Sequence, residues 1–84
     1  MTTFYVWCPS LGQTRDDAES IDAEDVCDAS EQYVESYEQR QCDYTVASGH
    51  ITMTCHVSRE DSDYHVKVDV EGVPRPRYLG RVMA

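Results

Sequence analysis

Two consecutive segments with strict alternation of apolar and polar residues constrain the fold of this chain more than any other feature. Residues 51–58 (ITMTCHVS) and residues 64–70 (YHVKVDV) change from apolar to polar at every step, and the polar residues 59–63 (REDSD) separate them. A period of two places all the apolar side chains of a strand on one face. The two segments therefore predict an antiparallel hairpin with an apolar face that another element has to cover.

The covering element is predicted between residues 23 and 41. Its apolar residues recur every three or four positions, which is the period of an amphipathic α-helix. These residues are Ala23, Val26, Cys27, Tyr33, Val34 and Tyr37. Ser20 or Asp22 is the expected N-cap, because either side chain can accept a hydrogen bond from a free amide of the first turn.

The rest of the chain predicts one or two further strands. Residues 3–8 (TFYVWC) are rich in β-branched and aromatic residues, which is typical of a strand, whereas residues 11–21 are polar and are expected to form a loop. Gly72 and the prolines behind it end the second hairpin strand, and residues 77–82 can return as a short edge strand. The sequence thus predicts a single α+β domain over residues 1–84, in the order β-α-β-β-β, with one amphipathic helix on a three- or four-stranded antiparallel sheet.

The charge of the chain limits its partners. Sixteen acidic and seven basic residues give a formal net charge of −9 at pH 7. This charge disfavours direct contact with nucleic-acid phosphates or anionic membranes and favours a basic partner, although the same charge can also serve only to keep a protein soluble. A chain of 84 residues forms one small core, in which a substrate pocket of about 300 Å³ or more is difficult to enclose. We therefore expect a binding protein and not an enzyme.

The cysteines and histidines do not form a recognisable metal or catalytic motif. Cys8, Cys27, Cys42 and Cys55 contain no C-x-x-C pair, so neither a metal nor a cofactor is expected. The first residues lack the features of a signal peptide, and no stretch is apolar enough to cross a bilayer. We accordingly expect a cytoplasmic protein whose reduced cysteines pack as small hydrophobic side chains.

Two histidines sit on the predicted outer side of the hairpin. His56 and His65 can face each other there. Neither has a second ligand at a fixed local spacing, so we expect them to be surface residues and not metal ligands.

The most informative feature for function is a window of ten acidic residues without a base, from Asp16 to Glu38. The predicted partner-binding residues are Asp16, Asp17, Glu24, Asp28, Glu31, Glu35 and Glu38. The last five step by four, three, four and three residues, which predicts one row on the helix face opposite the apolar stripe. No lysine follows these acids at helical spacing, so a partner that supplies positive charge would account for the row.

The run DDAESIDAEDVCDASEQYVESYE, with the small size, the acidity and the α+β pattern, resembles the small inhibitors of host defence that bacteriophages encode, of the anti-CRISPR and anti-restriction type. Such proteins commonly block a nuclease complex at its nucleic-acid groove. The resemblance implies a non-enzymatic inhibitor that acts in the host cytosol and occupies a basic groove of a nucleic-acid-binding or nuclease complex. The alternative expectation is a structural or assembly module that forms a homodimer through an exposed sheet edge.

Overall fold

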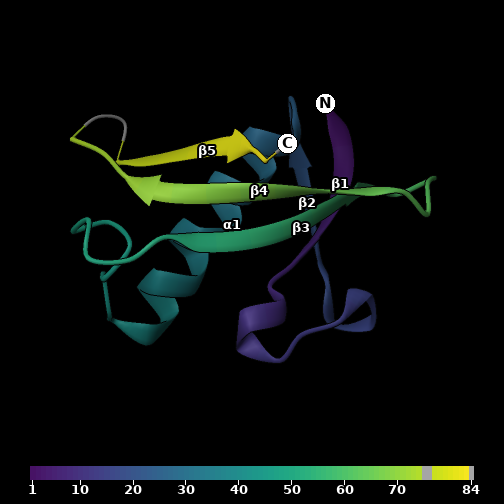
Figure 1. The fold of residues 1–84 in the computed structure, drawn as a ribbon. Coiled ribbons are helices and arrows are strands. Elements are labelled where there is room, and N and C mark those ends of the chain that lie inside the picture. Colours follow the sequence, from purple (N-terminus) through teal and green to yellow (C-terminus); the bar gives the residue numbers. More distant parts are fainter. Residues whose placement is uncertain (75–76, 84) are drawn as a thin grey trace.

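The computed structural model describes residues 1–74 and 77–83. One helix packs on one face of a five-stranded antiparallel sheet, which is an α+β fold (Figure 1). In chain order the elements are strand β1 (Thr2–Trp7), the short 3-10 helices η1 (Pro9–Leu11) and η2 (Arg15–Asp17), strand β2 (Glu19–Ala23), helix α1 (Val26–Gln41) and strands β3 (Met53–Arg59), β4 (His65–Gly72) and β5 (Tyr78–Val82).

The sheet is built around the predicted hairpin. Its spatial order is β2-β1-β3-β4-β5, and all neighbouring strands are antiparallel. In the hairpin Val57 lies opposite Val66 and Cys55 lies opposite Val68, which confirms the predicted pairing and its apolar face. On the other side of β3, Val6 of β1 lies opposite Val57. Strand β5 confirms the short edge strand expected near the C-terminus.

The sheet has five strands instead of the predicted three or four, because the polar segment before the helix contains β2. Ser20 and Asp22 of this strand are exposed, so β2 lacks the run of buried residues that would mark a strand in the sequence. Helix α1 consequently begins at Val26, later than predicted. Its N-cap is neither Ser20 nor Asp22 but Asp25, whose side chain accepts a hydrogen bond from the Asp28 amide at 2.8 Å. The observed order is β-β-α-β-β-β.

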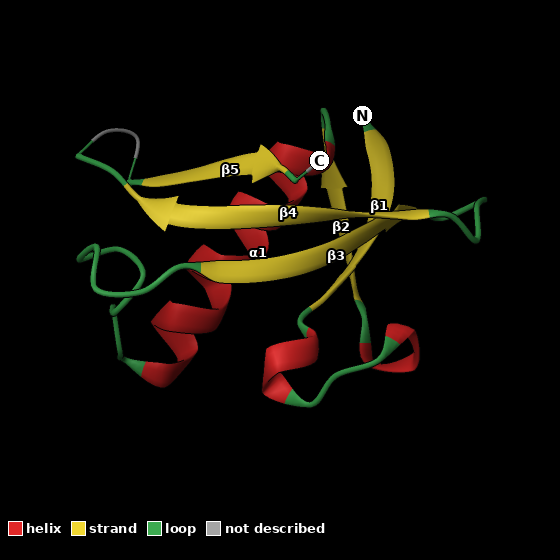
Figure 2. Ribbon diagram, viewed as in Figure 1, coloured by secondary structure: helices red, strands yellow, loops and turns green. Residues whose placement is uncertain are grey.

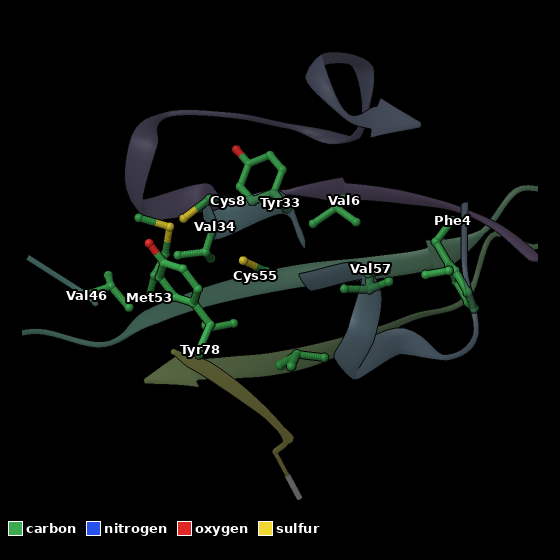
Figure 3. Close-up of a cluster of buried hydrophobic side chains, with 14 residues drawn as sticks. Phe4, Val6, Cys8, Tyr33, Val34, Val46, Met53, Cys55, Val57 and Tyr78 are labelled. Atoms are coloured by element: carbon green, nitrogen blue, oxygen red, sulfur yellow. The ribbon is translucent and has the colours of Figure 1, made fainter. Parts of the chain in front are cut away.

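The core lies between α1 and the sheet, as Figure 2 shows for the elements and Figure 3 for the side chains. Tyr33 and Val34 of the helix are buried against valines of the three central strands. The Tyr33 hydroxyl donates a hydrogen bond to Gln13 Oε1 at 2.6 Å, so the link between η1 and η2 is tied to the same face of the helix. Each fully buried aliphatic or aromatic side chain of this kind contributes about 1.5–3 kcal/mol.

The four cysteine thiols are free. Cys8 and Cys55 are buried in the core, as expected for small hydrophobic side chains, and Cys27 is partly buried. Cys42 departs from that expectation, because it is exposed at the C-cap of α1. Burial raises the pKa of the Cys55 and Cys27 thiols, which keeps both of them protonated at neutral pH.

The two edges of the sheet differ in how well they are covered. Helix α1 lies against β5, where the Gly80 amide donates a hydrogen bond to Glu31 Oε2 at 2.7 Å. A Cβ atom on Gly80 would approach Ser30 Oγ to 2.8 Å and the Cys27 carbonyl oxygen to 3.1 Å. At the other end of the sheet, β2 pairs with β1 and with no other described strand. The Thr3 carbonyl accepts from the Glu60 amide on the β3 side, so by alternation the Tyr5–Ser20 pair is not hydrogen-bonded and the backbone N–H and C=O of Ser20 point away from β1. The Asp22 carbonyl on the same edge accepts a hydrogen bond from Gln32 at 3.4 Å, so β2 is open at Ser20.

Candidate functional site

The carboxylates predicted to form one outward row on α1 lie in different environments, and Glu38 departs most from the prediction. Its side chain is buried, with 1% of the residue exposed. The carboxylate accepts hydrogen bonds from the Val46 amide at 2.8 Å, the Ala47 amide at 3.1 Å and the Tyr78 hydroxyl at 2.9 Å. Val34, one turn earlier on the helix, is buried too. The predicted outward row is therefore wrong for Glu38, which lies on the inward side of α1.

The Glu38 carboxylate holds the segment between α1 and β3 against the core through hydrogen bonds. A buried carboxylate is tolerated only when it is hydrogen-bonded, and here two backbone amides and one hydroxyl supply the donors. Burial, together with the hydrogen bond to Glu38 and its negative charge, raises the pKa of Tyr78 to about 12. Tyr78 therefore remains protonated and keeps donating to Glu38 across the neutral pH range.

Two other members of the predicted row bind the chain's own backbone. Glu31 accepts a hydrogen bond from the edge of β5. Asp28 Oδ2 accepts hydrogen bonds from the Glu24 amide at 3.3 Å and from the Gln32 side chain at 3.2 Å. Glu24 and Glu35 are exposed, but Glu24 precedes the helix. Of the five carboxylates predicted for the row, only Glu35 is an exposed side chain on α1.

Exposed carboxylates gather instead at the open edge of the sheet. Asp16 and Asp17 belong to η2, Asp22 belongs to β2, and Glu24 and Asp25 lead into α1. Strand β2 connects η2 to the start of α1 and is the last strand at one end of the sheet, so these residues follow that sheet edge. All five are exposed, and none forms an ion pair with a described residue. We call these five residues the acidic edge.

The sequence prediction includes three residues of the acidic edge and omits two. Asp16, Asp17 and Glu24 are among the predicted partner-binding residues, whereas Asp22 and Asp25 are not. Asp22 was expected to cap the helix and Asp25 fell inside the predicted helix but off the predicted row, so neither was included. The signal that could have found them is that residues 16–25 contain six acidic residues and no basic residue.

Elsewhere the chain's own arginines neutralise acidic residues. The ion pairs among the described residues are Arg15–Asp63 at 3.4 Å, Arg40–Glu19 at 2.8 Å, Arg59–Asp61 at 3.6 Å and Arg81–Glu71 at 3.0 Å. These pairs are exposed to solvent, so each contributes at most about 1 kcal/mol. They use four of the seven basic residues. Arg15 in η2 and the partner of Arg40, Glu19 in β2, lie next to the acidic edge but do not pair with its five carboxylates.

The face of the sheet opposite α1 carries an aromatic cluster of Trp7, His56 and His65. The two imidazole rings stack with centroids 4.7 Å apart and planes 17° apart, which confirms that the histidines face each other. Both rings meet the Trp7 indole edge to face, at 5.6 and 5.3 Å between centroids. Trp7 is only 5% exposed. Ser58, which pairs with His65, is 1% exposed, and its hydroxyl has no hydrogen-bond partner among the described residues.

The stacked imidazoles are poorly arranged to bind a metal ion. Rings that are 17° from parallel point their nitrogen lone pairs alongside one another. A zinc ion instead needs lone pairs that converge on one point, about 2.0–2.1 Å from each nitrogen. Within residues 1–74 and 77–83, no three His, Cys, Asp or Glu side chains are grouped to hold a metal ion. The geometry fits a packing role, in which an aromatic pair contributes about 0.5–1.5 kcal/mol.

The aromatic cluster is expected to make the protein pH-sensitive. Burial, followed by the positive charges of His65 and Lys67, lowers the pKa of His56 below its ordinary value of 6.5. Because the folded state resists protonation, this group contributes stability above pH 6.5 that is lost as the pH falls through the folded-state pKa. Lowering the pH from about 8 to about 5 should reduce the thermal midpoint and quench the fluorescence of Trp7, the single tryptophan, as imidazolium forms beside it.

The matched control for this pH titration is His50, an exposed histidine outside the cluster whose ring nitrogen bonds Ser48. His50→Gln should leave the fluorescence profile unchanged, while His56→Gln should reduce its component below pH 6.5, because only the His65 ring then remains beside Trp7. Identical profiles for the wild type and His56→Gln would contradict the assignment.

The geometry of the described residues thus offers one exposed acidic edge and one aromatic cluster, in which Trp7 is buried, His56 is partly buried and His65 is exposed. None of the helices in the described part of the chain has the length and apolar character needed to cross a membrane. Searches against protein-family models, curated proteins and solved structures found no match to this chain.

Proposed function

We propose that this chain is a non-enzymatic binding protein whose acidic edge occupies a basic surface of a nucleic-acid-binding protein. The observation that carries the proposal is the acidic edge, five exposed carboxylates that form no ion pair with a described residue. Asp17, Asp22 and Asp25 accept hydrogen bonds from the chain, but these bonds leave their negative charge unneutralised. Neighbouring like charges destabilise an isolated protein through mutual repulsion. A partner that presents lysine and arginine side chains removes this repulsion on binding, and its nucleic acid is displaced from the same positive surface.

The position of these acids on an open sheet edge adds a second means of recognition. The outward N–H and C=O of Ser20 are available to an extended segment of the partner, which can pair with β2 as an additional strand. Basic side chains on such a segment would lie beside Asp22 and the neighbouring acids. The proposed partner surface is therefore both basic and able to present an extended stretch of chain.

The second candidate function, a homodimer through a sheet edge, is less favoured by the same geometry. The outer edge of β5 is covered by α1 through Glu31 and Gly80. Antiparallel pairing of two β2 edges would bring their acids together, and like charges on paired strands are destabilising. Sedimentation over a range of concentrations separates the candidates, because the homodimer hypothesis requires association that strengthens with concentration and tolerates salt.

The proposal is tested by comparing two variants of equal charge. Asp16→Lys with Glu24→Lys reverses two charges in the acidic edge, and Glu35→Lys with Glu60→Lys reverses two exposed charges outside it. Each pair changes the formal net charge from −9 to −5, since −9 + 4 = −5. The immobilised proteins would be used to capture partners from a bacterial lysate, and the affinity of a captured nucleic-acid-binding protein would then be measured after purification.

The acidic-edge variant should bind this partner at least about tenfold more weakly, a loss of about 1.4 kcal/mol, and the control variant within about twofold of the wild type. Raising the salt from about 50 to about 500 mM should weaken the wild-type complex strongly, because exposed charges are screened. The wild-type chain should also displace nucleic acid from the partner. Equal loss in both variants, or a complex indifferent to salt, would contradict the acidic edge as the binding surface.

A further inference from the structure

A cavity of about 290 Å³ lies between the C-terminal turn of α1, the helix η1 and the segment that leads into β3. Its lining includes Leu11, Tyr37, Glu38, Asp43, Ile51 and Met53. The volume is slightly below the usual range for drug-sized ligands, about 300–1,000 Å³. It is suited to a group the size of one long side chain.

The electrostatic character of this cavity favours a cation. Among the described residues, its lining contains two carboxylates, Glu38 and Asp43, and no basic residue. The C-terminal turn of a helix carries partial negative charge from its free carbonyl groups, and that turn forms one wall. Arg40, the basic residue in the last turn of α1, does not line the cavity and pairs with Glu19.

The two carboxylates have different roles in the cavity. Both oxygens of Glu38 already accept hydrogen bonds from the chain, so Glu38 acts on a ligand through its charge. Asp43 is exposed, and its side chain forms no hydrogen bond or ion pair with a described residue. Asp43 is therefore the group that can contact a cation directly.

The remaining walls suit the apolar stem of a side chain. Leu11 and Ile51 are 37% and 51% exposed, although large aliphatic side chains are usually buried. Met53 adds a buried apolar surface, and Tyr37 adds an aromatic ring, which attracts cations. A ligand that fits these walls has an apolar stem and a cationic tip near the carboxylate. A long basic side chain has both.

We propose that this cavity is the anchor site for one arginine side chain of the partner. Arginine is favoured over lysine because its guanidinium is less strongly hydrated, stacks on aromatic rings and offers several donors to a carboxylate and to helix carbonyls. This inference rests on the proposed function, since it identifies one contact of a basic partner. The acidic edge supplies general attraction, and the cavity supplies a specific position for one residue.

The test uses the isolated protein and a small probe, so it does not depend on finding the partner. Amide chemical shifts of the labelled chain are followed by NMR during titration with n-butylguanidinium. Saturable shifts are expected at residues 41–45 and at Ile51. The uncharged isostere N-butylurea should bind at least about tenfold more weakly, because it lacks the cation. Shifts that never saturate, or equal binding of the urea, would overturn the proposal.

Two variants of equal net charge locate the binding site. Asp43→Asn should weaken n-butylguanidinium binding by threefold to tenfold, roughly the effect of one exposed charge pair. Glu60→Gln removes one exposed charge elsewhere and should leave the affinity within about twofold of the wild type. Equal effects of the two substitutions would show that only net charge matters and would overturn the assignment of Asp43.

The two proposals fail in distinguishable ways. Asp16→Lys with Glu24→Lys should abolish partner capture while n-butylguanidinium still shifts the cavity amides. If the probe binds the cavity but no basic partner is captured, the proposed function fails and the cation site remains. If a partner binds through the acidic edge but Asp43→Asn has no effect on either ligand, the arginine anchor is wrong and the proposed function remains.

Discussion

Replacing Glu38 with alanine is expected to lower the free energy of unfolding by about 3–5 kcal/mol. The substitution removes the acceptor of the Val46 amide, the Ala47 amide and the Tyr78 hydroxyl. Val46 and Tyr78 are 0% and 3% exposed, so their donors would lack ready access to water. A domain of this size has a total stability of about 5–15 kcal/mol, and the loss would therefore leave a marginally folded protein.

The measurement is chemical denaturation followed by circular dichroism, with Glu35→Ala as the matched control. Glu35 lies on the same helix three residues earlier and is exposed, so its removal should change the stability by less than about 0.5 kcal/mol. The loss of stability in Glu38→Gln should lie between those of Glu38→Ala and Glu35→Ala. The glutamine side chain keeps one oxygen acceptor, but its NH2 group would face the donors that Glu38 accepts from. Similar unfolding midpoints for Glu38→Ala and Glu35→Ala would show that the buried carboxylate does not stabilise the fold.

Replacing Gly72 with alanine is expected to cost about 3 kcal/mol, at the upper end of the usual range for overpacking. A Cβ atom at this position would lie 2.0 Å from the Val46 carbonyl oxygen and 2.7 Å from the Ala47 carbonyl oxygen. Backbone atoms cannot rotate away as a flexible side chain can. The same segment is held by Glu38, so relief of the clash would strain those hydrogen bonds.

Thermal and chemical unfolding of Gly72→Ala should be compared with Gly12→Ala. Gly12 has no heavy atom within 4 Å of its ideal Cβ position, but its φ angle is +77°. Alanine at this position should lower the free energy of unfolding by only about 1–2 kcal/mol, because a residue with a Cβ atom disfavours the left-handed conformation. Gly72 does not have the left-handed conformation of Gly12. A loss at Gly72→Ala no larger than that at Gly12→Ala would therefore contradict the close-packing explanation. The effects of Gly72→Ala and Glu38→Ala should not add in a double variant, because both act on the same segment.

The elements with a strong local pattern were predictable from the sequence. The hairpin of β3 and β4 follows from alternation alone, because a period of two has only one regular structural solution. The helix was placed correctly over most of its length, because Tyr33 and Val34 fall on one stripe of a 3.6-residue repeat. Strand β2 was missed because a short, polar edge strand buries too little to leave a periodic signal.

The sequence indicated that the candidate site is acidic, but it did not indicate that the exposed acids lie at the edge of the sheet and not along the helix. The acidic window identified Asp16, Asp17 and Glu24 correctly as exposed carboxylates. The same window could not show that Glu38 is buried, since its charge suggests exposure and the donors that satisfy it lie elsewhere in the chain. Nor could it show the capping of β5 by Glu31, because the strand that supplies the donor lies 49 residues further along the chain.

By itself, the sequence determined the fold class, the position of the hairpin and helix, and the excess of negative charge, since each of these depends on local periodicity or on composition. Only the tertiary structure decided which carboxylates remain outside. A charged side chain at the boundary of a helix face becomes a core residue when distant amides and hydroxyls satisfy it, as Val46, Ala47 and Tyr78 do for Glu38. Those donors are brought to one place by chain topology, which residue spacing on a single element does not reveal.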